Sequence, residues 1–582
     1  MEKRPDGRTA TPQTLRLRTA TRTLRLHLDE LPIDYDLAVP GDRFLAGMAF
    51  MFARQRYACA ESMIGSGFGG TVIGSMARGL FVDGLRWLWI ANHPDRRRCL
   101  LGELRDERNR LCILLEETDA SIGNKPRWLM PLPDIADLTG QSLSWLDAPP
   151  MPDDAELLDH FLARRVDPQP SSGSGEHAEL LRRTHTLLDM SGLRGAVMVL
   201  AHAGHGNHLG LLSSLTEDGA AACDLRADHE ALFMQVAAVG VAATLLGVAE
   251  TVPETWPADV SRRPFLERAV ELAADVAAAA VPIHKLDTAR RPTPQARKKS
   301  TKAPPVVLMR PGIVLDAEEL LPDVNSVDAV IAAAQEYDRL TRSGWSTRPQ
   351  TFDQPTLHAK LAYNGGHSNL QAVMATYDKP GSAVIAPYAA RMLLEEAARM
   401  RWRYSAGDPE AFKVRAKQYF DEFRARRRKT IETLAGSGVP RAEAHRIFAL
   451  PGNIQVITPE DEIAPNRQAL PKIDTMLREM GAPYPEPGWL EVAYSLLSQI
   501  THSTALGHLH AIRFRHDTLV NELSPEMLGL TLDVACLGSA HLIGMGARLL
   551  TGDGQDAVRY HQDLVRQAAM VHSAAQWVHG LD

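Results

Sequence analysis

Residues 495–509 read SLLSQITHSTALGHL, and residues 198–212 read MVLAHAGHGNHLGLL. Laid over each other without a gap, both stretches carry a histidine, a Leu-Gly pair four residues later, and then another leucine. With the same offset of 297 positions, the match extends without a gap over residues 193–249 and 490–546. The repetition predicts that one helical unit occurs twice in the chain.

A second match lies upstream of the first, with an offset of 313 positions. VIGSMARGLFVDGLRWLW (residues 72–89) aligns with IAPYAARMLLEEAARMRW (residues 385–402). Two matches in the same order, with polar residues kept in both, favour a tandem duplication of a domain over a short solenoid repeat. The offset falls by 16 between the matches, so we place 16 additional residues in the first copy, in the Ser/Gly/Pro-rich stretch 167–177.

The composition is typical of a soluble globular protein, with 45% hydrophobic and 23% charged residues over 582 positions. A broad nucleic-acid-binding surface is usually basic, so the formal net charge of −7 restricts any such contact to a local region. The five cysteines form no CxxC pair, which fits reduced thiols. The N-terminal residues lack the apolar core of a secretory signal, and we expect a cytoplasmic protein.

The duplication gives the domain boundaries. Residues 1–35 are interpreted as a basic N-terminal arm, either disordered or lying on the surface. The first helical domain covers residues 36–285 and the second residues 313–582. Residues 286–312 form a Pro-rich basic linker that cannot bury a core. Because the rest of the chain is acidic, any contact with RNA or a nucleotide is expected through the arm and the linker.

The periodicity predicts an all-α protein. Apolar residues recur at helical spacing in both copies, and Ser326 and Ser524 are placed to cap helices. Two long apolar stretches, 231–249 and 528–546, are rich in small residues and are interpreted as buried core helices rather than membrane spans. The main strand-like fragment is NIQVI at 453–457. We expect two helical bundles that pack on each other around a pseudo-twofold axis, with a homodimer left open.

The candidate catalytic residues are polar residues that recur in both copies, together with their neighbours on the same helices. They are Arg391, Glu396, Arg399, Tyr494, Ser498 and His502 in the second copy, and Arg78, Asp83 and His205 in the first. At 100° per residue, Arg391 and Arg399 lie within about 80° of each other, and Glu396 is close enough to pair with Arg399. A histidine on a mostly apolar helix needs a polar partner, and the helix that carries these arginines is expected to supply it.

Two interpretations of this set remain open. Arginine, acid and histidine side chains that line a cleft can transfer protons and stabilise anions. The same groups can also form a buried network that only fixes the register of two helices.

No metal or cofactor is expected. His202, His205 and His208 lie in one stretch, but no acid lies among them and only His205 recurs in the other copy. The chain contains no ExxH, HExxH, GxxxxGK[ST] or GxSxG motif.

The second copy resembles an uncharacterised bacterial helical domain of the HEPN superfamily. In that domain an Arg-x-x-x-Glu-like helix precedes a Tyr-x-x-Leu-Ser-x-x-x-His helix. The corresponding residues in the second copy are Arg391, Glu395, Tyr494, Leu497, Ser498 and His502. Val82 and Val197 replace the acid and the tyrosine in the first copy.

The resemblance implies an RNA-cleaving or defence-related helical protein, with a composite cleft between the two copies. The usual HEPN signature is an arginine followed four to six residues later by a histidine. With six and five residues between them, Arg86–His93 and Arg566–His572 come closest to that spacing, and neither pair recurs in the other copy. The first hypothesis is therefore a HEPN-like protein that acts on RNA or a nucleotide, in stress or phage response. The alternatives are a metal-independent enzyme acting on a small molecule in a cavity between the bundles, and a non-catalytic interaction protein.

Overall fold

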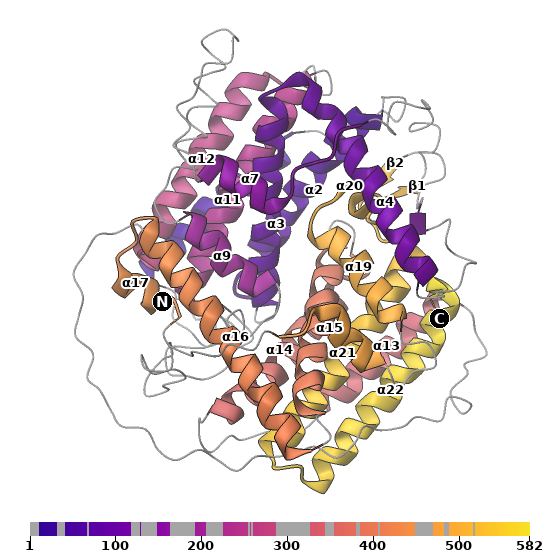
Figure 1. Cartoon of the computed structure of the whole chain (residues 1–582). Helices are drawn as coiled ribbons and strands as arrows, with labels where there is room; N and C mark the ends of the chain where they lie inside the picture. The colour runs from indigo at the N-terminus through magenta and orange to yellow at the C-terminus, as the bar shows by residue number, and fades with distance from the viewer. Residues whose placement is uncertain are drawn as a thin grey trace.

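The computed structural model describes residues 11–31, 41–66, 69–117, 128–129, 148–162, 193–204, 225–253, 256–257, 260–286, 326–343, 354–379, 384–405, 408–448, 470–481, 488–515 and 518–581. The protein is all-α, as predicted (Figure 1). Among the described residues, the only strands are the short antiparallel pair β1 (Arg513–Arg515) and β2 (Thr518–Val520). The strand-like fragment 453–457 and the linker, except for Leu286, lie outside the described residues.

The described residues fall into two halves, 11–286 and 326–581. The helices of the first half are α1 (Pro12–Asp29), α2 (Gly41–Met63), α3 (Gly70–Ala91), η1 (Pro94–Arg98), α4 (Cys99–Glu117), α7 (Asp154–Leu162), α9 (Leu193–Gly204), α11 (Ala227–Thr251) and α12 (Arg262–His284). The helices of the second half are α13 (Val327–Arg342), α14 (Gln354–Thr376), α15 (Ile385–Tyr404), α16 (Pro409–Gly436), α17 (Arg441–Arg446), α18 (Ile473–Gly481), α19 (Trp489–Thr501), α20 (Ala505–His510), α21 (Pro525–Leu550) and α22 (Gln555–His579).

Corresponding pairs of helices pack together in the two halves. In the first half, α11 packs against α2, α3 and α12, and α1 packs against α12. In the second half, α21 packs against α14, α15 and α22, and α13 packs against α22. This repeated pattern of contacts is what a tandem duplication would produce, although the duplication itself stays a prediction.

One close helix crossing in each half also corresponds. A Cβ atom at Gly240 would lie 2.5 Å from the carbonyl carbon of Leu80, and one at Gly538 would lie 2.8 Å from that of Leu393. Leu80 and Leu393 are aligned by the upstream sequence match, so α11 and α21 occupy the same place against α3 and α15. The glycines differ by 298 positions, which shifts the register of these helices by one residue from the ungapped sequence alignment.

The two central helices, α11 and α21, are the long apolar stretches noted in the sequence. By length and composition both could span a membrane, but 100% and 94% of their most apolar windows are buried inside the protein. They form the centre of their halves, which agrees with the predicted role as core helices. Ser326 and Ser524 cap α13 and α21 as predicted, accepting hydrogen bonds from the backbone amides of Ala329 and Met527.

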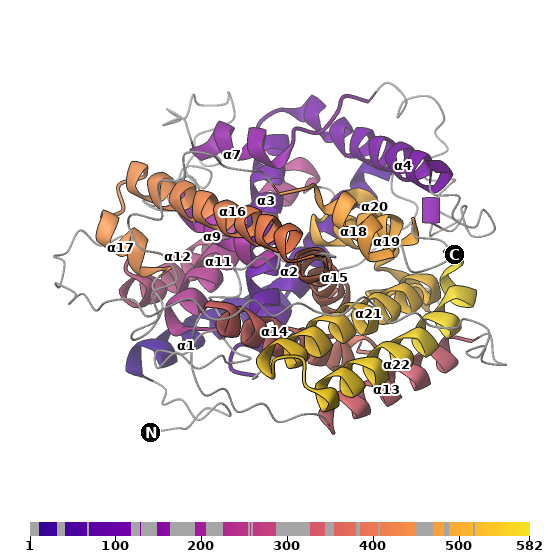
Figure 2. The same cartoon turned by 60° about the horizontal axis from the view of Figure 1, so that its bottom comes forward.

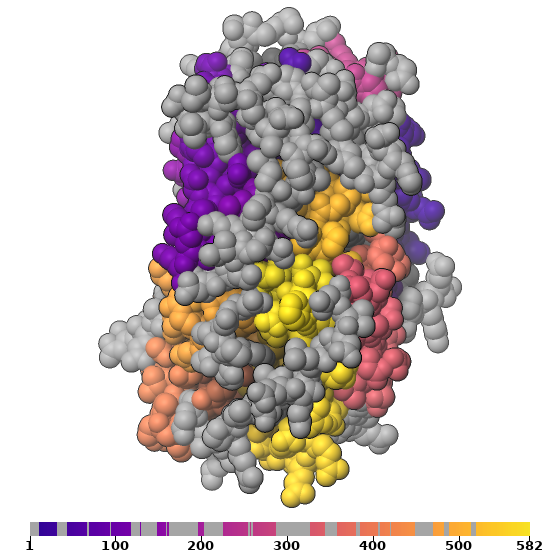
Figure 3. Space-filling model, turned by 90° about the vertical axis from the view of Figure 1, so that its right-hand side faces the viewer, coloured from indigo at the N-terminus to yellow at the C-terminus, as the bar shows by residue number. Residues whose placement is uncertain are grey.

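The halves exchange helices. In the second half, α16 lies along α9 of the first half, while α4 of the first half lies against α19 and α20 of the second (Figure 2). In the space-filling view, the violet surface of α4 adjoins the orange surface of the second half (Figure 3). At the α16 end, Arg446 pairs with Asp228 at 3.0 Å, and Nε2 of His202 lies 2.9 Å from Oγ1 of Thr430. The junction between the halves is therefore an extensive internal interface.

The predicted N-terminal arm is corrected by the structure. Residues 12–29 form α1, in which Leu17, Leu24 and Leu28 are fully buried. Their spacing of seven and four places them on one face, which intervening arginines and threonines hide in the sequence. Arg25 of α1 pairs with Glu61 at 3.0 Å, so part of the charge expected to contact RNA is neutralised within the chain.

Candidate functional site

A partly exposed group of three polar side chains lies where the two halves meet. Nδ1 of His502, directly after α19, is 3.4 Å from Nη1 of Arg78 on α3. The first residue of α7, Asp154, accepts a hydrogen bond from Nη2 of Arg78 at 2.7 Å, and its Oδ2 lies 3.9 Å from Nδ1 of His502. The solvent-exposed fraction of the side chain is 31% for His502, 16% for Arg78 and 28% for Asp154. A ligand can therefore reach this site, which we call the junction site.

The carboxylate of Asp154 stabilises the junction site electrostatically. Burial raises the pKa of Asp154, but Arg78 and His502 lower it further, so the net pKa lies below its usual value. The carboxylate is thus ionised at neutral pH and stabilises the positive charge of Arg78. An arginine can bind an anionic group, and a histidine held by a carboxylate can transfer a proton.

The turn after α19 fixes the position of His502. The amide of His502 donates to the carbonyl of Ser498 at 2.8 Å, and the next residue, Ser503, has a φ of 58°. This left-handed conformation is unfavourable for a residue other than glycine, and it is compensated here by contacts from the first half. Arg56 donates to the hydroxyl of Ser503, and Arg86 donates to its carbonyl at 3.1 Å.

Behind this turn, the first half contributes a buried ion cluster. Arg56 pairs with Asp83 at 2.7 Å, and Arg86 lies 3.6 Å from Asp83 and 3.3 Å from Glu103. Burial raises the pKa of Asp83, while Arg56 and Arg86 lower it, which leaves a value of about 6. Asp83, a predicted catalytic residue, is only 3% exposed and pairs with the two arginines that contact Ser503.

The next acid of this cluster, Glu107, contacts the start of α20. Its Oε2 accepts a hydrogen bond from the amide of Leu506 at 3.1 Å. Burial and the nearby Glu103 raise its pKa to about 8. Glu103 and Glu107 of α4 are therefore directed into the second half, away from solvent.

The predicted residues of the second half form a separate network. Arg391 on α15 donates to the hydroxyls of Ser498 and Tyr494 on α19, each at 3.0 Å, and its Nη2 lies 3.4 Å from Glu395. Arg399 also donates to Glu395. Burial lowers the pKa of Arg391, but Tyr494 and Glu395 raise it above its usual value, so the guanidinium stays charged. Because His502 directly follows α19, this network anchors the helix that positions the histidine.

Glu396 lies apart from that network. Its Oε1 is 3.5 Å from Nε2 of His358, and its Oε2 is 3.7 Å from Arg399, so the predicted pairing with Arg399 exists only as a long ion pair. Neither oxygen accepts a hydrogen bond from the described residues. Burial raises the pKa of Glu396 to about 8, despite the opposing charge of Arg399. The acid that joins Arg391 to Arg399 is therefore Glu395.

The structure thus divides the predicted site. Arg391 and Glu396 contact residues of the second half, whereas His502 contacts Arg78 and Asp154 of the first. We expected the same arrangement at His205 in the first copy, but His205 lies outside the described residues. Asp154 was missed because it lies outside the two stretches that the sequence matches align.

In neither of the two Arg–His pairs that come closest to the HEPN spacing does the arginine contact the histidine. Arg86 is buried against Asp83 and Glu103, while His93 is exposed and lies 3.7 Å from Asp95. Arg566 pairs with the exposed Asp563 on its own helix.

No family model, curated protein or solved structure matches the chain. The function must therefore be inferred from the described side chains alone.

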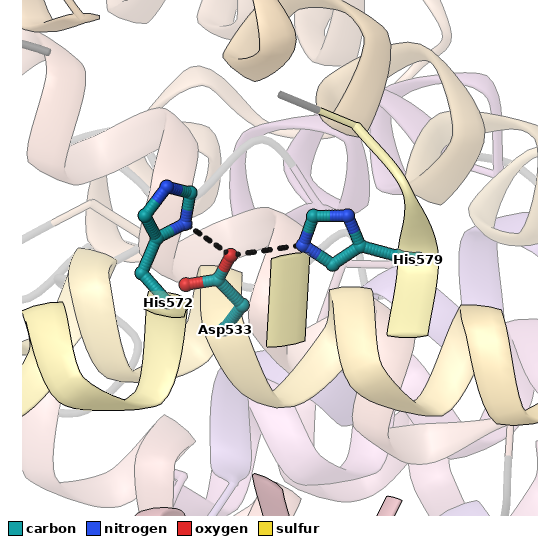
Figure 4. Close-up of side chains that lie close together, drawn as sticks. All are labelled: Asp533, His572 and His579. Atoms are coloured by element: carbon teal, nitrogen blue, oxygen red, sulfur yellow. Dashed lines mark hydrogen bonds and ion pairs between the residues drawn. The ribbon is translucent and has the colours of Figure 1, made fainter. Parts of the chain in front are cut away.

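A second polar cluster lies between α21 and α22, and the sequence analysis missed it. Oδ2 of Asp533 lies 2.8 Å from Nδ1 of His572 and 3.2 Å from Nε2 of His579 (Figure 4). Asp533 is fully buried, and Trp489 stacks on both imidazoles, at 4.8 Å from His572 and 6.2 Å from His579. Burial raises the pKa of Asp533, but His572 and His579 lower it below its usual value, so the carboxylate is ionised.

Part of this cluster has a counterpart in the first half. The amide of Leu581 donates to Nδ1 of His579 at 3.0 Å, as the amide of Leu286 donates to Nδ1 of His284 at 3.1 Å. Nε2 of His284 contacts the side-chain oxygen of Gln235. The signal in the sequence is the tripeptide His-x-Leu at the end of α12 and of α22, which lies outside the two aligned stretches.

Proposed function

We propose that the protein is an acid–base enzyme that acts on RNA or a nucleotide at the junction site. The observation that carries the proposal is the contact between Arg78 and His502, which come from opposite halves and remain partly exposed. Arg391, Glu396, Arg399 and Asp83 are less than a tenth exposed, so a substrate cannot reach them without rearrangement. Tyr494 and Ser498 are partly exposed, but both bind the buried Arg391. The junction site is where a predicted arginine and a predicted histidine together meet solvent.

The side chains suit a phosphodiester substrate. Arg78 would neutralise the charge on the phosphate, and His502 would take the proton from the attacking hydroxyl group. Asp154 would keep the imidazole oriented and favour its protonated form after the transfer. In RNA the neighbouring 2′-hydroxyl would attack the phosphorus, and the bond from phosphorus to the 5′ oxygen would break. The products would be a 2′,3′-cyclic phosphate and a 5′-hydroxyl that takes its proton from water. DNA lacks the 2′-hydroxyl, so cleavage would be specific for RNA.

The remaining predicted residues are proposed to position the site. Arg391 would hold α19 through Tyr494 and Ser498, and the arginines of the first-half cluster would hold the turn at Ser503. A tandem duplication supports this division of labour, because two related halves would give the composite cleft that the HEPN resemblance implies. The repeated helix contacts and the equivalent crossings at Gly240 and Gly538 favour the duplication.

The test is cleavage of RNA by the purified full-length protein, with a chelator present. An oligoribonucleotide and the same sequence with 2′-deoxyribose would be incubated with the wild type and with His502→Gln. We expect cleavage of the RNA alone, and at least about a 100-fold slower reaction with the variant. His93→Gln is the matched control, because His93 belongs to an Arg–His spacing but is exposed and remote from the junction contacts. Intact RNA with the wild type would refute the proposal, and equal rates with His502→Gln would refute the site.

A further inference from the structure

The cluster of Asp533, His572 and His579 needs an explanation that goes beyond packing. In the first half, the histidine at the end of α12 is satisfied by the neutral amide of Gln235. The second half replaces that amide with a carboxylate and adds a second imidazole. The need for a histidine at the end of the helix explains His579. It does not explain the charge of Asp533 or the presence of His572.

Burying the charge of Asp533 costs free energy, so the presence of this carboxylate where the first half has Gln235 needs a cause. Asp533 has no exposed surface, and its Oδ1 accepts no hydrogen bond from the described residues. An ionised carboxylate in such a place costs free energy unless a positive charge lies beside it. The two imidazoles approach the other oxygen, Oδ2, from the side of α22 (Figure 4). The arrangement suits a cation held between a carboxylate and two nitrogens.

We propose that Asp533, His572 and His579 bind one divalent transition-metal ion of the zinc class. Two imidazoles and one carboxylate are a usual ligand set for such ions, whereas Mg²⁺ and Ca²⁺ prefer oxygen ligands. The site is independent of the junction site and of the proposed action on RNA.

The distances are compatible with this assignment. The three ligand atoms lie within 4.8 Å of one another, and both nitrogens are 2.8–3.2 Å from Oδ2. Ligands about 2.1 Å from a tetrahedral zinc ion are separated by about 3.4 Å, so only small side-chain movements are required. The second oxygen, Oδ1, is available to share the metal. His572 is the exposed edge of the site, with 19% of its side chain accessible, and a water ligand can enter there.

One contact must change when the metal binds. A neutral histidine that binds a metal through Nε2 carries its proton on Nδ1. In His579, Nδ1 accepts the amide hydrogen of Leu581, so that amide has to turn away. Gly580, between the two residues, has a φ of 63° and no side chain, and it allows the rotation. Metal binding is therefore coupled to the backbone at Gly580 and Leu581.

The experiment is a titration of the full-length protein with Co²⁺ after treatment with a chelator and dialysis. We expect one equivalent of Co²⁺ to produce the visible absorption of a low-coordinate site with nitrogen and oxygen ligands, and Zn²⁺ to displace it. Asp533→Asn keeps the size of the side chain and reproduces the amide chemistry of Gln235, and we expect it to bind Co²⁺ at least about tenfold more weakly. His572→Gln, at a partly exposed position, serves as the second variant.

A matched control separates this site from other histidines. His284→Gln alters the first-half counterpart, which has no carboxylate, and should leave the Co²⁺ titration unchanged. Exchange of the Leu581 amide hydrogen should become faster when Zn²⁺ is added to the wild type. The proposal is overturned if the wild type shows no such absorption, or if Asp533→Asn and His572→Gln bind Co²⁺ as tightly as the wild type.

Discussion

Nδ1 of His502 lies 3.4 Å from Nη1 of Arg78, although 424 positions separate the two residues in the chain. The contact exists because the turn after α19 reaches across the junction between the halves. Asp154 completes the group by pairing with the arginine at 2.7 Å. Arginine, histidine and carboxylate thus come from two helices and a turn that the sequence alone does not bring together.

Asp154 should set the pH range in which the junction site works. Its ionised carboxylate favours the protonated form of His502. In Asp154→Asn, the acidic limb of the profile of cleavage rate against pH should therefore move to lower pH, while Arg78 still binds the phosphate. Rates of RNA cleavage between about pH 5 and 8 measure this shift. An unchanged acidic limb would show that Asp154 does not act on the histidine.

Glu396 should make the protein less stable as the pH rises. Its pKa is raised to about 8 in the folded state, from an ordinary value of 4.5, so the folded state binds a proton that the unfolded state has released. This contribution is complete below about pH 4.5 and is lost as the pH rises through about 8. Glu396→Gln should therefore raise the melting temperature relative to the wild type at about pH 8.5, and by less at about pH 5.5. The exposed Glu410→Gln is the control, and a pH-independent difference for Glu396→Gln would contradict the expectation.

Arg56 should be essential for stability because it is fully buried beside Asp83. Arg56→Met leaves that carboxylate with the more distant Arg86 only, and removes the hydrogen bond to Ser503. We expect a loss of about 3–5 kcal/mol in the free energy of unfolding by denaturant. Arg478→Met, which breaks a pair between Glu491 and an arginine side chain that is 65% exposed, should cost about 1 kcal/mol or less. Equal effects of the two substitutions would argue against the buried cluster.

Gly240 should not tolerate a side chain. The methyl group of Gly240→Ala would lie 2.5 Å from the backbone of Leu80 and force α11 away from α3, with an expected cost of about 1–3 kcal/mol. Gly436→Ala is the control, because a Cβ atom there meets nothing within 4 Å and alanine favours the helix. Chemical denaturation of both variants measures the difference. A neutral Gly240→Ala would show that the helices are farther apart than described.

The local features of the fold could be predicted from the sequence, because they depend on neighbouring residues. The caps at Ser326 and Ser524 and the burial of α11 and α21 follow from composition and spacing. The leucines of α1 were overlooked because arginines and threonines stand between them. Even there, the helical spacing was present in the sequence.

The candidate site was less predictable, because its contacts depend on how the halves pack. The sequence pointed to Arg391 and Glu396 as partners of His502, but the packing of α3 against α19 across the junction brings Arg78 to the histidine instead. Nothing in the periodicity of either helix encodes that packing. The contacts of Asp533 with His572 and His579, 39 and 46 positions away, likewise depend on the packing of two helices.

The central claim is that Arg78 and His502 act together as one site across the junction. A double-mutant cycle of RNA cleavage rates with Arg78→Gln, His502→Gln and the double variant tests it most directly. We expect each single substitution to slow cleavage by about 100-fold or more, and the double variant to be no slower than the slower single variant. Independent effects that multiply in the double variant, or cleavage that neither substitution slows, would contradict a shared site.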